Sequence, residues 1–228
     1  MLSFLASSCM QQTKTIDSDF SGQLTEEEIS NGVMTPEIMW KFGRLGDAQL
    51  SPDGLGVIYN VTRYDSKTNK SITDIFWIST EGGDPIQLTN GSGKYYNPRW
   101  NPVDPKIGFL SAESGSTQIW QMNLDGSGRT QISEFENGIN SFEYSPDGTH
   151  IMFTSDVKLD RIPVEMYPDL PLATVRIIVD LMYRHWNDWH DYAYSHIFVA
   201  PCEKEQIGDA TDIMKDEPWD SPLSPIFD

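Results

Sequence analysis

The sequence has only two cysteines, Cys9 and Cys202, which lie far apart along the chain and in unlike contexts. Two cysteines cannot make a disulfide framework, and no CxxC or mixed Cys/His spacing typical of a zinc site occurs. No stretch is long and apolar enough to span a bilayer as a helix. These absences exclude a small disulfide-stapled domain and a helical transmembrane span, and we expect no metal and no cofactor.

Basic residues are also few, because 16 Lys and Arg stand against 34 Asp and Glu, giving a formal net charge of −18. Such a field repels phosphate backbones, so nucleic acid is not expected as a partner. We interpret the acidity as a means of keeping a secreted protein soluble. Attraction of cationic peptide ends is the alternative. Hydrophobic residues make up 38% of the chain, which is enough for a globular core.

The first nine residues are apolar and then small, and they end in Cys9. This order is similar to the end of a bacterial lipoprotein signal, in which small residues precede a cysteine that is lipidated. The positively charged segment with which such signals begin is missing. The alternative is an unstructured N-terminus with an incidental cysteine. We therefore expect a signal remnant and flexible tether over residues 1–33, and a periplasmic or envelope location with a possible lipid anchor at Cys9.

A short helix is expected at the start of the ordered region. Thr35 can cap it, Pro36 suits its first position, and Glu37 favours the positive end of the helix dipole. Gly43 and Gly46 are expected to end it.

The main signal is an internal repeat. Ser51-Pro52-Asp53-Gly54 recurs as Ser145-Pro146-Asp147-Gly148, and a degraded copy is Asn101-Pro102-Val103-Asp104. Proline fixes φ, aspartate bonds the local backbone and glycine takes positive φ, so each copy predicts a tight turn between two strands. An aromatic residue follows each proline by seven positions: Tyr59, Phe109 and Phe153.

A second hairpin follows each of the first two turns, with Ile75-Phe76-Trp77-Ile78 matching Ile119-Trp120-Gln121-Met122. Each unit therefore has four strands, and four-stranded units at this period are propeller blades. We predict an all-β fold, an incomplete β-propeller over residues 34–228, with blades at about 45–92, 93–138 and 139–215 and a fourth begun at 216–228. One set of residues should alternate with exposed neighbours: Ile75, Trp77, Leu88, Phe109, Ile119, Trp120, Ile132, Phe153 and Ile197. Trp77 and Trp120 break the strict alternation, so one of each pair of neighbours is expected to pack between blades.

The third unit is interrupted. Seventeen residues separate Pro102 from Ile119, but 51 separate Pro146 from the matching Ile197, so about 34 residues are inserted between the second and third strands. We place this insertion at about 158–195. An apolar stripe that includes Val175 and Ile178 predicts a helix from position 172 to about 184.

The turns resemble the propeller repeats of dipeptidyl-peptidase- and acylaminoacyl-peptidase-like enzymes of the prolyl oligopeptidase family. TolB-type propellers share such turns, so the insertion is the more specific marker. Its sequence is similar to a segment typical of bacterial members: Asp180-Leu181-Met182-Tyr183-Arg184-His185-Trp186, then Trp189, His190 and Ser195-His196-Ile197-Phe198-Val199.

The resemblance implies a C-terminal α/β-hydrolase domain that holds a serine, aspartate and histidine triad. The present chain has no G-x-S-x-G elbow, since Gly91-Ser92-Gly93 and Gly126-Ser127-Gly128 have the wrong spacing. We therefore expect no catalytic residue in this chain and a hydrolase domain beyond Asp228. The implied function is the substrate-access part of a secreted serine exopeptidase acting on short peptides. A non-enzymatic TolB-type propeller that binds periplasmic proteins is the alternative.

The insertion supplies the candidate site residues. His185 and His190 are five apart and would point to different faces of a helix, so they do not predict a metal site. Aromatic and acidic side chains suit the ammonium group of a peptide through cation–π contact and charge. The candidates for substrate binding are Glu165, Arg184, Trp186, Asp188 and Trp189, and simple packing of these aromatics on the blade is the alternative.

Overall fold

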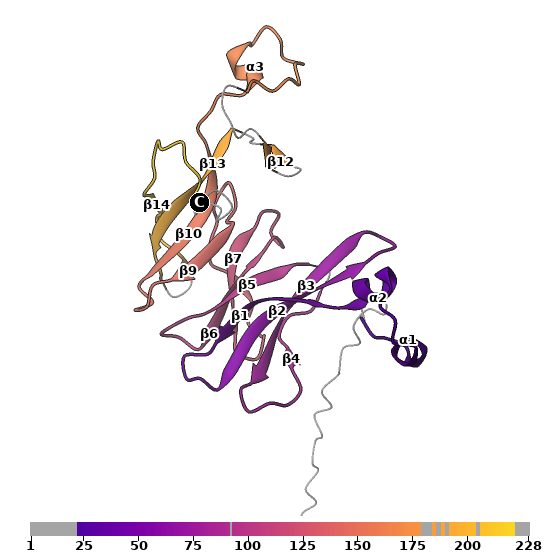
Figure 1. Cartoon of the computed structure of the whole chain (residues 1–228). Coiled ribbons are helices and arrows are strands. Elements are labelled where there is room, and N and C mark those ends of the chain that lie inside the picture. The colour runs from indigo at the N-terminus through magenta and orange to yellow at the C-terminus, as the bar shows by residue number, and fades with distance from the viewer. Residues whose placement is uncertain are drawn as a thin grey trace, which may run out of the picture. The chain divides into compact units, whose positions relative to one another are not determined.

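The computed structural model describes residues 22–91, 93–178, 184–185, 188–189, 192–203 and 206–221 (Figure 1). The chain divides into two compact units. The first comprises Met1–Arg44 and Thr62–Ile72, and the second comprises Leu45–Val61 and Thr73–Asp228.

From residue 22 on, where the description of the first unit begins, it carries the helices α1 (Glu26–Asn31) and α2 (Pro36–Lys41). The prediction of α2 is confirmed, because the Thr35 side chain accepts a hydrogen bond from the backbone N–H of Ile38 and Pro36 opens the helix. The helix ends at Lys41, before the glycines that were expected to stop it, because Phe42 already has extended backbone angles.

Helix α1 lies within the stretch interpreted as a tether, and that interpretation did not anticipate it. A capping box forms it: Thr25 accepts from the N–H of Glu28, whose carboxylate accepts from the N–H of Thr25 at 2.8 Å. The same carboxylate binds Lys41 Nζ at 2.8 Å, which ties α1 to α2.

Four-stranded antiparallel sheets follow one another along the chain, and they belong to the second unit except for residues 44, 62–65 and 70–72 of the first sheet (Figure 1). We call them blades 1, 2 and 3, and they confirm the predicted all-β propeller architecture. Blade 1 is β1 (Arg44–Leu50), β2 (Gly56–Asp65), β3 (Lys70–Ser79) and β4 (Ile86–Gln87); blade 2 is β5 (Tyr95–Trp100), β6 (Lys106–Ser111), β7 (Gln118–Asn123) and β8 (Thr130–Gln131); blade 3 is β9 (Ser141–Tyr144), β10 (His150–Lys158), β13 (Ala193–Pro201) and β14 (Thr211–Asp212). Residues 222–228, most of the expected fourth blade, lie outside the described residues.

The repeated turns form by local chemistry. In the third copy, Asp147 Oδ1 accepts from the Ser145 hydroxyl at 2.6 Å and from the N–H of Thr149 at 3.0 Å, and Gly148 has φ +68°. In the first copy, Asp53 makes the equivalent bonds, and Gly54 has φ +74°. The side chain therefore closes the turn, as the sequence predicts.

These bonds predict a measurable pH dependence. The Ser145 hydroxyl and the Thr149 N–H lower the pKa of Asp147 to about 2. An aspartate in an unfolded chain titrates near pH 3.9. The stabilisation by this carboxylate is therefore fully present above about pH 4 and is lost as the pH falls towards about 2. Asp147→Asn should lower the melting temperature at pH 7, and the difference from wild type should shrink between pH 4 and pH 2.

Asp84→Asn is the matched control, because among the described residues no hydrogen bond or ion pair to that carboxylate occurs. Its melting curve should track wild type at each pH. A deficit of Asp147→Asn that is the same at pH 2 and pH 7 would contradict the assignment.

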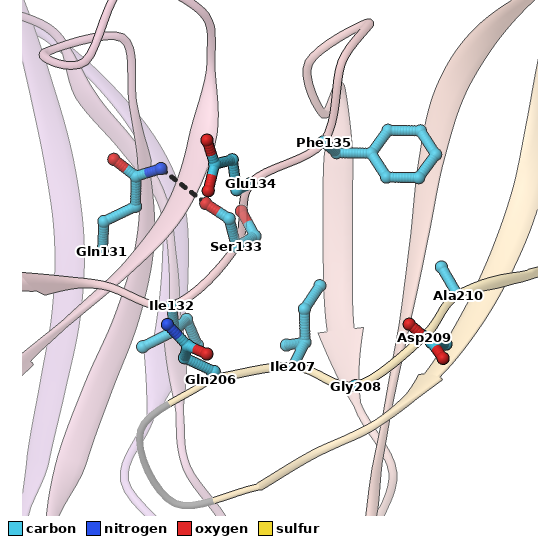
Figure 2. A pocket seen from close by; sticks show the side chains of 10 residues that line it. All are labelled: Gln131, Ile132, Ser133, Glu134, Phe135, Gln206, Ile207, Gly208, Asp209 and Ala210. Atoms are coloured by element: carbon cyan, nitrogen blue, oxygen red, sulfur yellow. Dashed lines mark hydrogen bonds between the residues drawn. The ribbon is translucent and has the colours of Figure 1, made fainter.

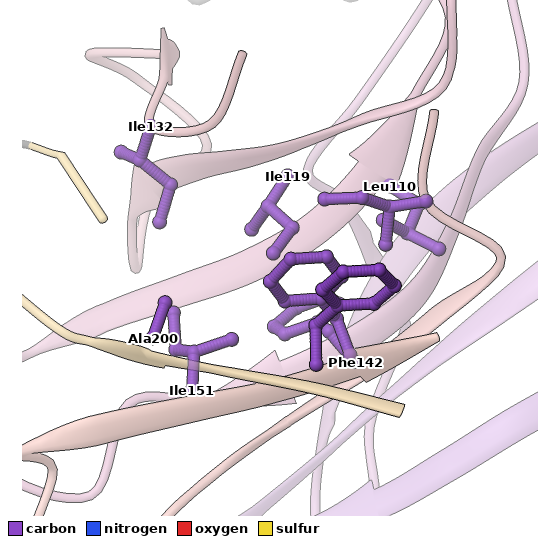
Figure 3. Close-up of a cluster of buried hydrophobic side chains, with 9 residues drawn as sticks. Leu110, Ile119, Ile132, Phe142, Ile151 and Ala200 are labelled. Atoms are coloured by element: carbon purple, nitrogen blue, oxygen red, sulfur yellow. The ribbon is translucent and has the colours of Figure 1, made fainter. Parts of the chain in front are cut away.

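Two apolar clusters join the blades, and blade 2 contributes to both. The strand β6 alternates between them, since Ile107 and Phe109 enter one cluster and Leu110 enters the other. The 1/2 cluster contains Ile58, Ile75, Leu88, Tyr95, Ile107, Phe109 and Met122. The 2/3 cluster, drawn in Figure 3, contains Leu110, Ile119, Ile132, Ile139, Phe142, Ile151, Phe153, Phe198 and Ala200.

The predicted alternation of buried and exposed residues is wrong for blade 2. Residues 107–111 of β6 are all buried, because both faces of this sheet are covered by neighbouring blades. Alternation does occur in part of blade 3, where Phe153 is buried and its neighbour Met152 is exposed. Ile197 is only half-buried, and the buried residues on either side of it are His196 and Phe198.

The insertion into blade 3 is partly helical, but the predicted helix is wrong over its described part. The helix is α3 (Pro163–Met166), whereas residues 173–178 have no regular structure. Val175 and Ile178 are 60% and 48% exposed, so the described part of the predicted apolar stripe does not pack on a core.

Candidate functional site

The insertion leaves blade 3 at the end of β10 and returns at the start of β13, and a short neck closes it. The backbone N–H groups of Leu159 and Asp160 both donate to the carbonyl of Tyr192 at 3.2 Å. Tyr192 has φ +66°, which turns the chain back into β13. Asp160 also accepts a hydrogen bond from the Tyr194 hydroxyl at 2.8 Å, so the two ends of the insertion are joined by side chains as well as by the backbone.

Glu165 lies on α3, and its carboxylate is already used within the insertion. One oxygen is paired with Lys158 Nζ, and the other accepts from the N–H of Ile162 at 2.9 Å, at the start of the helix. Lys158 and the Ile162 N–H lower the pKa of Glu165. The carboxylate is thus a fixed anion whose charge is offset by a lysine of the same segment.

Trp189 lies on β12 (Asp188–Trp189), which pairs with β11 (Arg184–His185) in a small hairpin. The guanidinium of Arg176 lies over the indole ring, 5.2 Å from its centroid. The Arg176 guanidinium therefore already occupies one cation–π position on this ring. Trp189 is 38% exposed, so it is in part accessible to solvent.

The other sequence-predicted site residues are placed only in part. For Arg184 and Asp188 the structure describes the backbone, in the β11–β12 hairpin. Trp186 and Cys9 lie outside the described residues. Among the described candidates, Glu165 and Trp189 each meet a basic residue of the insertion, Lys158 and Arg176 respectively.

A groove of about 590 Å³ lies between blade 2 and blade 3, at the end of β13 opposite the insertion (Figure 2). Residues 131–135 form one wall and residues 206–210 form the other, and the N–H of Ile207 donates to the carbonyl of Ile132 at 2.8 Å. The groove has two acidic residues, Glu134 and Asp209, and contains none of the sequence-predicted site residues.

No group of three or more metal-ligating side chains occurs among the described residues. Within the same part of the chain, no helix is long and apolar enough to cross a membrane.

Sequence reasoning did not find Arg176 as a partner of Trp189, or Asp160 and Tyr194 as the side-chain link across the neck. Arg176 lies 13 residues before Trp189, inside a segment that was predicted to be helical. Such long-range pairs carry no local spacing signal.

No protein-family model matches the chain. Two curated relatives do match over most of its length. The chain is 32% identical over 207 residues to dipeptidyl-peptidase 5 of Porphyromonas endodontalis, covering 91% of this chain and 30% of the relative. It is 40% identical over 192 residues to dipeptidyl-peptidase 5 of Porphyromonas gingivalis, covering 84% of this chain and 28% of the relative. The chain therefore spans less than a third of the length of these relatives.

The fold is similar to that of part of a solved peptidase. An acylaminoacyl peptidase from Pyrococcus horikoshii superposes with a TM-score of 0.57 at 19% identity, over 76% of this chain and 25% of that one. The chain corresponds to the β-propeller part of a bacterial, dipeptidyl-peptidase- and acylaminoacyl-peptidase-like member of the prolyl oligopeptidase family.

Proposed function

We propose that the chain is the substrate-access part of a secreted serine exopeptidase that acts on short peptides, and that the catalytic α/β-hydrolase domain lies outside this chain. The observation that carries the proposal is the match to dipeptidyl-peptidase 5 over 91% of the chain but 30% of the relative. In this arrangement the blades form a scaffold, and the insertion of blade 3 contacts the N-terminal part of the peptide.

Trp189 is the candidate contact best supported by the geometry. The residue is partly exposed, and the Arg176 guanidinium over its ring shows that the ring attracts a cation, so a peptide ammonium group would bind at the part that Arg176 leaves open. Glu165 is less suited to this role, because Lys158 offsets its charge and the start of α3 uses its second oxygen.

We also propose an envelope location with a lipid at Cys9, supported by the small residues that precede this cysteine. In cells fed a labelled fatty acid, the protein should carry label and Cys9→Ser should not. Equal labelling of the two proteins would reject lipidation at Cys9.

The test of function uses the longer gene product that contains this chain, with dipeptidyl chromogenic substrates. Trp189→Ala should raise KM by about 2-fold to 30-fold with little change in kcat, since a cation–π contact contributes about 0.5–2 kcal/mol. The longer product should be blocked by a serine-directed inhibitor, and the 228-residue chain alone should give only background hydrolysis.

Trp219→Ala is the matched control, because this exposed tryptophan lies outside the insertion. An unchanged KM in Trp189→Ala would reject the contact while leaving the peptidase assignment intact. A longer product without a G-x-S-x-G elbow or inhibitor-sensitive turnover would reject the peptidase and favour a binding propeller.

A further inference from the structure

The buried histidine of blade 3 has an unusual set of hydrogen-bond partners. His196 lies on β13 and its side chain has no exposed surface. Its Nδ1 is 2.8 Å from Asp212 Oδ2, and its Nε2 is 2.9 Å from the backbone carbonyl oxygen of Glu217. Both partners belong to the segment that follows β13 and closes the outer edge of the blade.

Both partners can only accept hydrogen bonds, because one is a carboxylate and the other a carbonyl. A neutral imidazole has one N–H and one lone pair, so it cannot donate to both. To satisfy both contacts, His196 and Asp212 together must carry one more proton than a neutral imidazole and an ionised carboxylate would. That proton belongs on the ring, because imidazole is a much stronger base than a carboxylate.

We infer that His196 is an imidazolium that fastens the outer edge of blade 3, and that loss of one of its ring protons at higher pH releases the segment around Glu217. This inference does not depend on the proposed function. It concerns the base of the insertion, since His196 lies three residues after Ala193, where the insertion re-enters the blade.

Among the described charged groups near the His196 ring, Asp212 is the counterion, because the other acidic side chains accept hydrogen bonds from other residues. On the β10 side, the residue opposite His196 is Ser155, whose hydroxyl donates to the carbonyl of Gly138. The next residue of β10, Asp156, accepts from Asn140, and Asp220 accepts from the N–H of Ser195. Asp212 uses its second oxygen to accept from the N–H of Met214 at 2.8 Å.

The bond that is lost can be identified. A ring with one proton keeps it at Nδ1, where the acceptor is a charged carboxylate and the bond is the stronger one. The Nε2 lone pair then faces the carbonyl oxygen of Glu217, and this contact becomes repulsive. The second ring proton therefore stabilises the contact with Glu217, and its removal at higher pH takes that stabilisation away.

Amide hydrogen exchange tests the inference directly. In the 228-residue chain, protection factors for residues 214–221 should fall on the order of 10-fold between pH 6 and pH 9, because a charge-assisted bond is lost. Protection of β6 and β7, corrected for intrinsic exchange in the same way, should stay constant. Ring ¹⁵N shifts of His196 should show both nitrogens protonated at pH 6.

Asp212→Asn distinguishes this mechanism from a loss of structure at alkaline pH that does not involve His196. The new amide can donate to Nδ1 while its oxygen still accepts from Met214, so a neutral ring then donates from Nε2 to the Glu217 carbonyl. Protection of residues 214–221 should therefore no longer depend on pH in this variant. His150→Gln, on an exposed histidine, should behave as wild type. A neutral His196 ring at pH 6, or the same pH dependence in Asp212→Asn, would overturn the inference.

Discussion

Replacement of Phe153 by alanine is expected to lower the free energy of unfolding by about 3–5 kcal/mol. The ring is 1% exposed and lies in the 2/3 cluster, which joins two blades. It stacks on Phe198 with centroids 5.3 Å apart and meets the edge of Phe135 at 5.1 Å. Truncation therefore removes apolar contacts within blade 3 and between blades, and leaves a cavity lined by aromatic side chains.

The measurement is urea denaturation followed by tryptophan fluorescence. Met152→Ala is the matched control, because this neighbour on β10 is 45% exposed, and its replacement should cost less than about 1 kcal/mol. Since small domains are stable by only about 5–15 kcal/mol, Phe153→Ala should be partly unfolded without denaturant if the chain lies near the lower limit. Equal midpoints for the two variants would mean that blades 2 and 3 are not held together by this cluster.

The features that the sequence predicts well are those made by neighbouring residues. The Ser-Pro-Asp-Gly turn closes through bonds between Ser145, Asp147 and Thr149, which are all within four positions of one another. The cap of α2 is likewise set by Thr35 and the residue three positions later. Because the residues in contact are also close in the sequence, the sequence pattern alone identifies each contact.

The burial pattern needs information that a single strand does not contain. Residues such as Phe109 and Leu110 are adjacent and both fully buried, because they point into different inter-blade clusters. A period-2 rule assumes that one face of the sheet meets solvent. The rule fails for blade 2 because a neighbouring blade covers each of its faces, and it holds better around Met152, which is exposed beside the buried Phe153.

The predicted helix fails over residues 172–178, the part of it that the structure describes, for a related reason. Val175 and Ile178 have helical spacing, but a short helix needs a surface on which to pack its apolar face. These side chains remain exposed, so the β-branched residues lose the only interaction that would favour a helix. In contrast, α3 has Pro163 at its first turn and a Glu165 carboxylate at its N-terminus, and forms with four residues.

The pairing of the candidate side chains within the insertion was not predicted. The ring of Trp189 meets a cation. That cation is Arg176 of the same chain, and Glu165 is likewise paired with Lys158. The sequence shows which side chains can bind an ammonium group, but only the fold shows that basic groups of this chain already contact them.

Gly126→Ala is expected to destabilise the protein by about 2–4 kcal/mol, through backbone strain and a steric clash together. The residue lies in the turn between β7 and β8 with φ +80°, a conformation that L side chains rarely adopt. A Cβ atom there would lie 2.3 Å from the carbonyl oxygen of Leu88, which belongs to blade 1. That backbone cannot easily move, because the N–H of Leu88 donates to the carbonyl of Ile75 at 2.8 Å.

Gly115→Ala separates the two causes. Gly115 has φ +110°, but a Cβ atom there would meet nothing within 4 Å, so its replacement carries only the conformational cost of about 1–2 kcal/mol. The excess loss in Gly126→Ala, measured by urea denaturation, then reports the contact between the β7–β8 turn and Leu88. Because Leu88 is part of the 1/2 cluster, Gly126→Ala should also increase hydrogen exchange in β3 and β4, whereas Gly115→Ala should not. Equal losses in the two variants would mean that the turn of blade 2 does not pack against the backbone of blade 1.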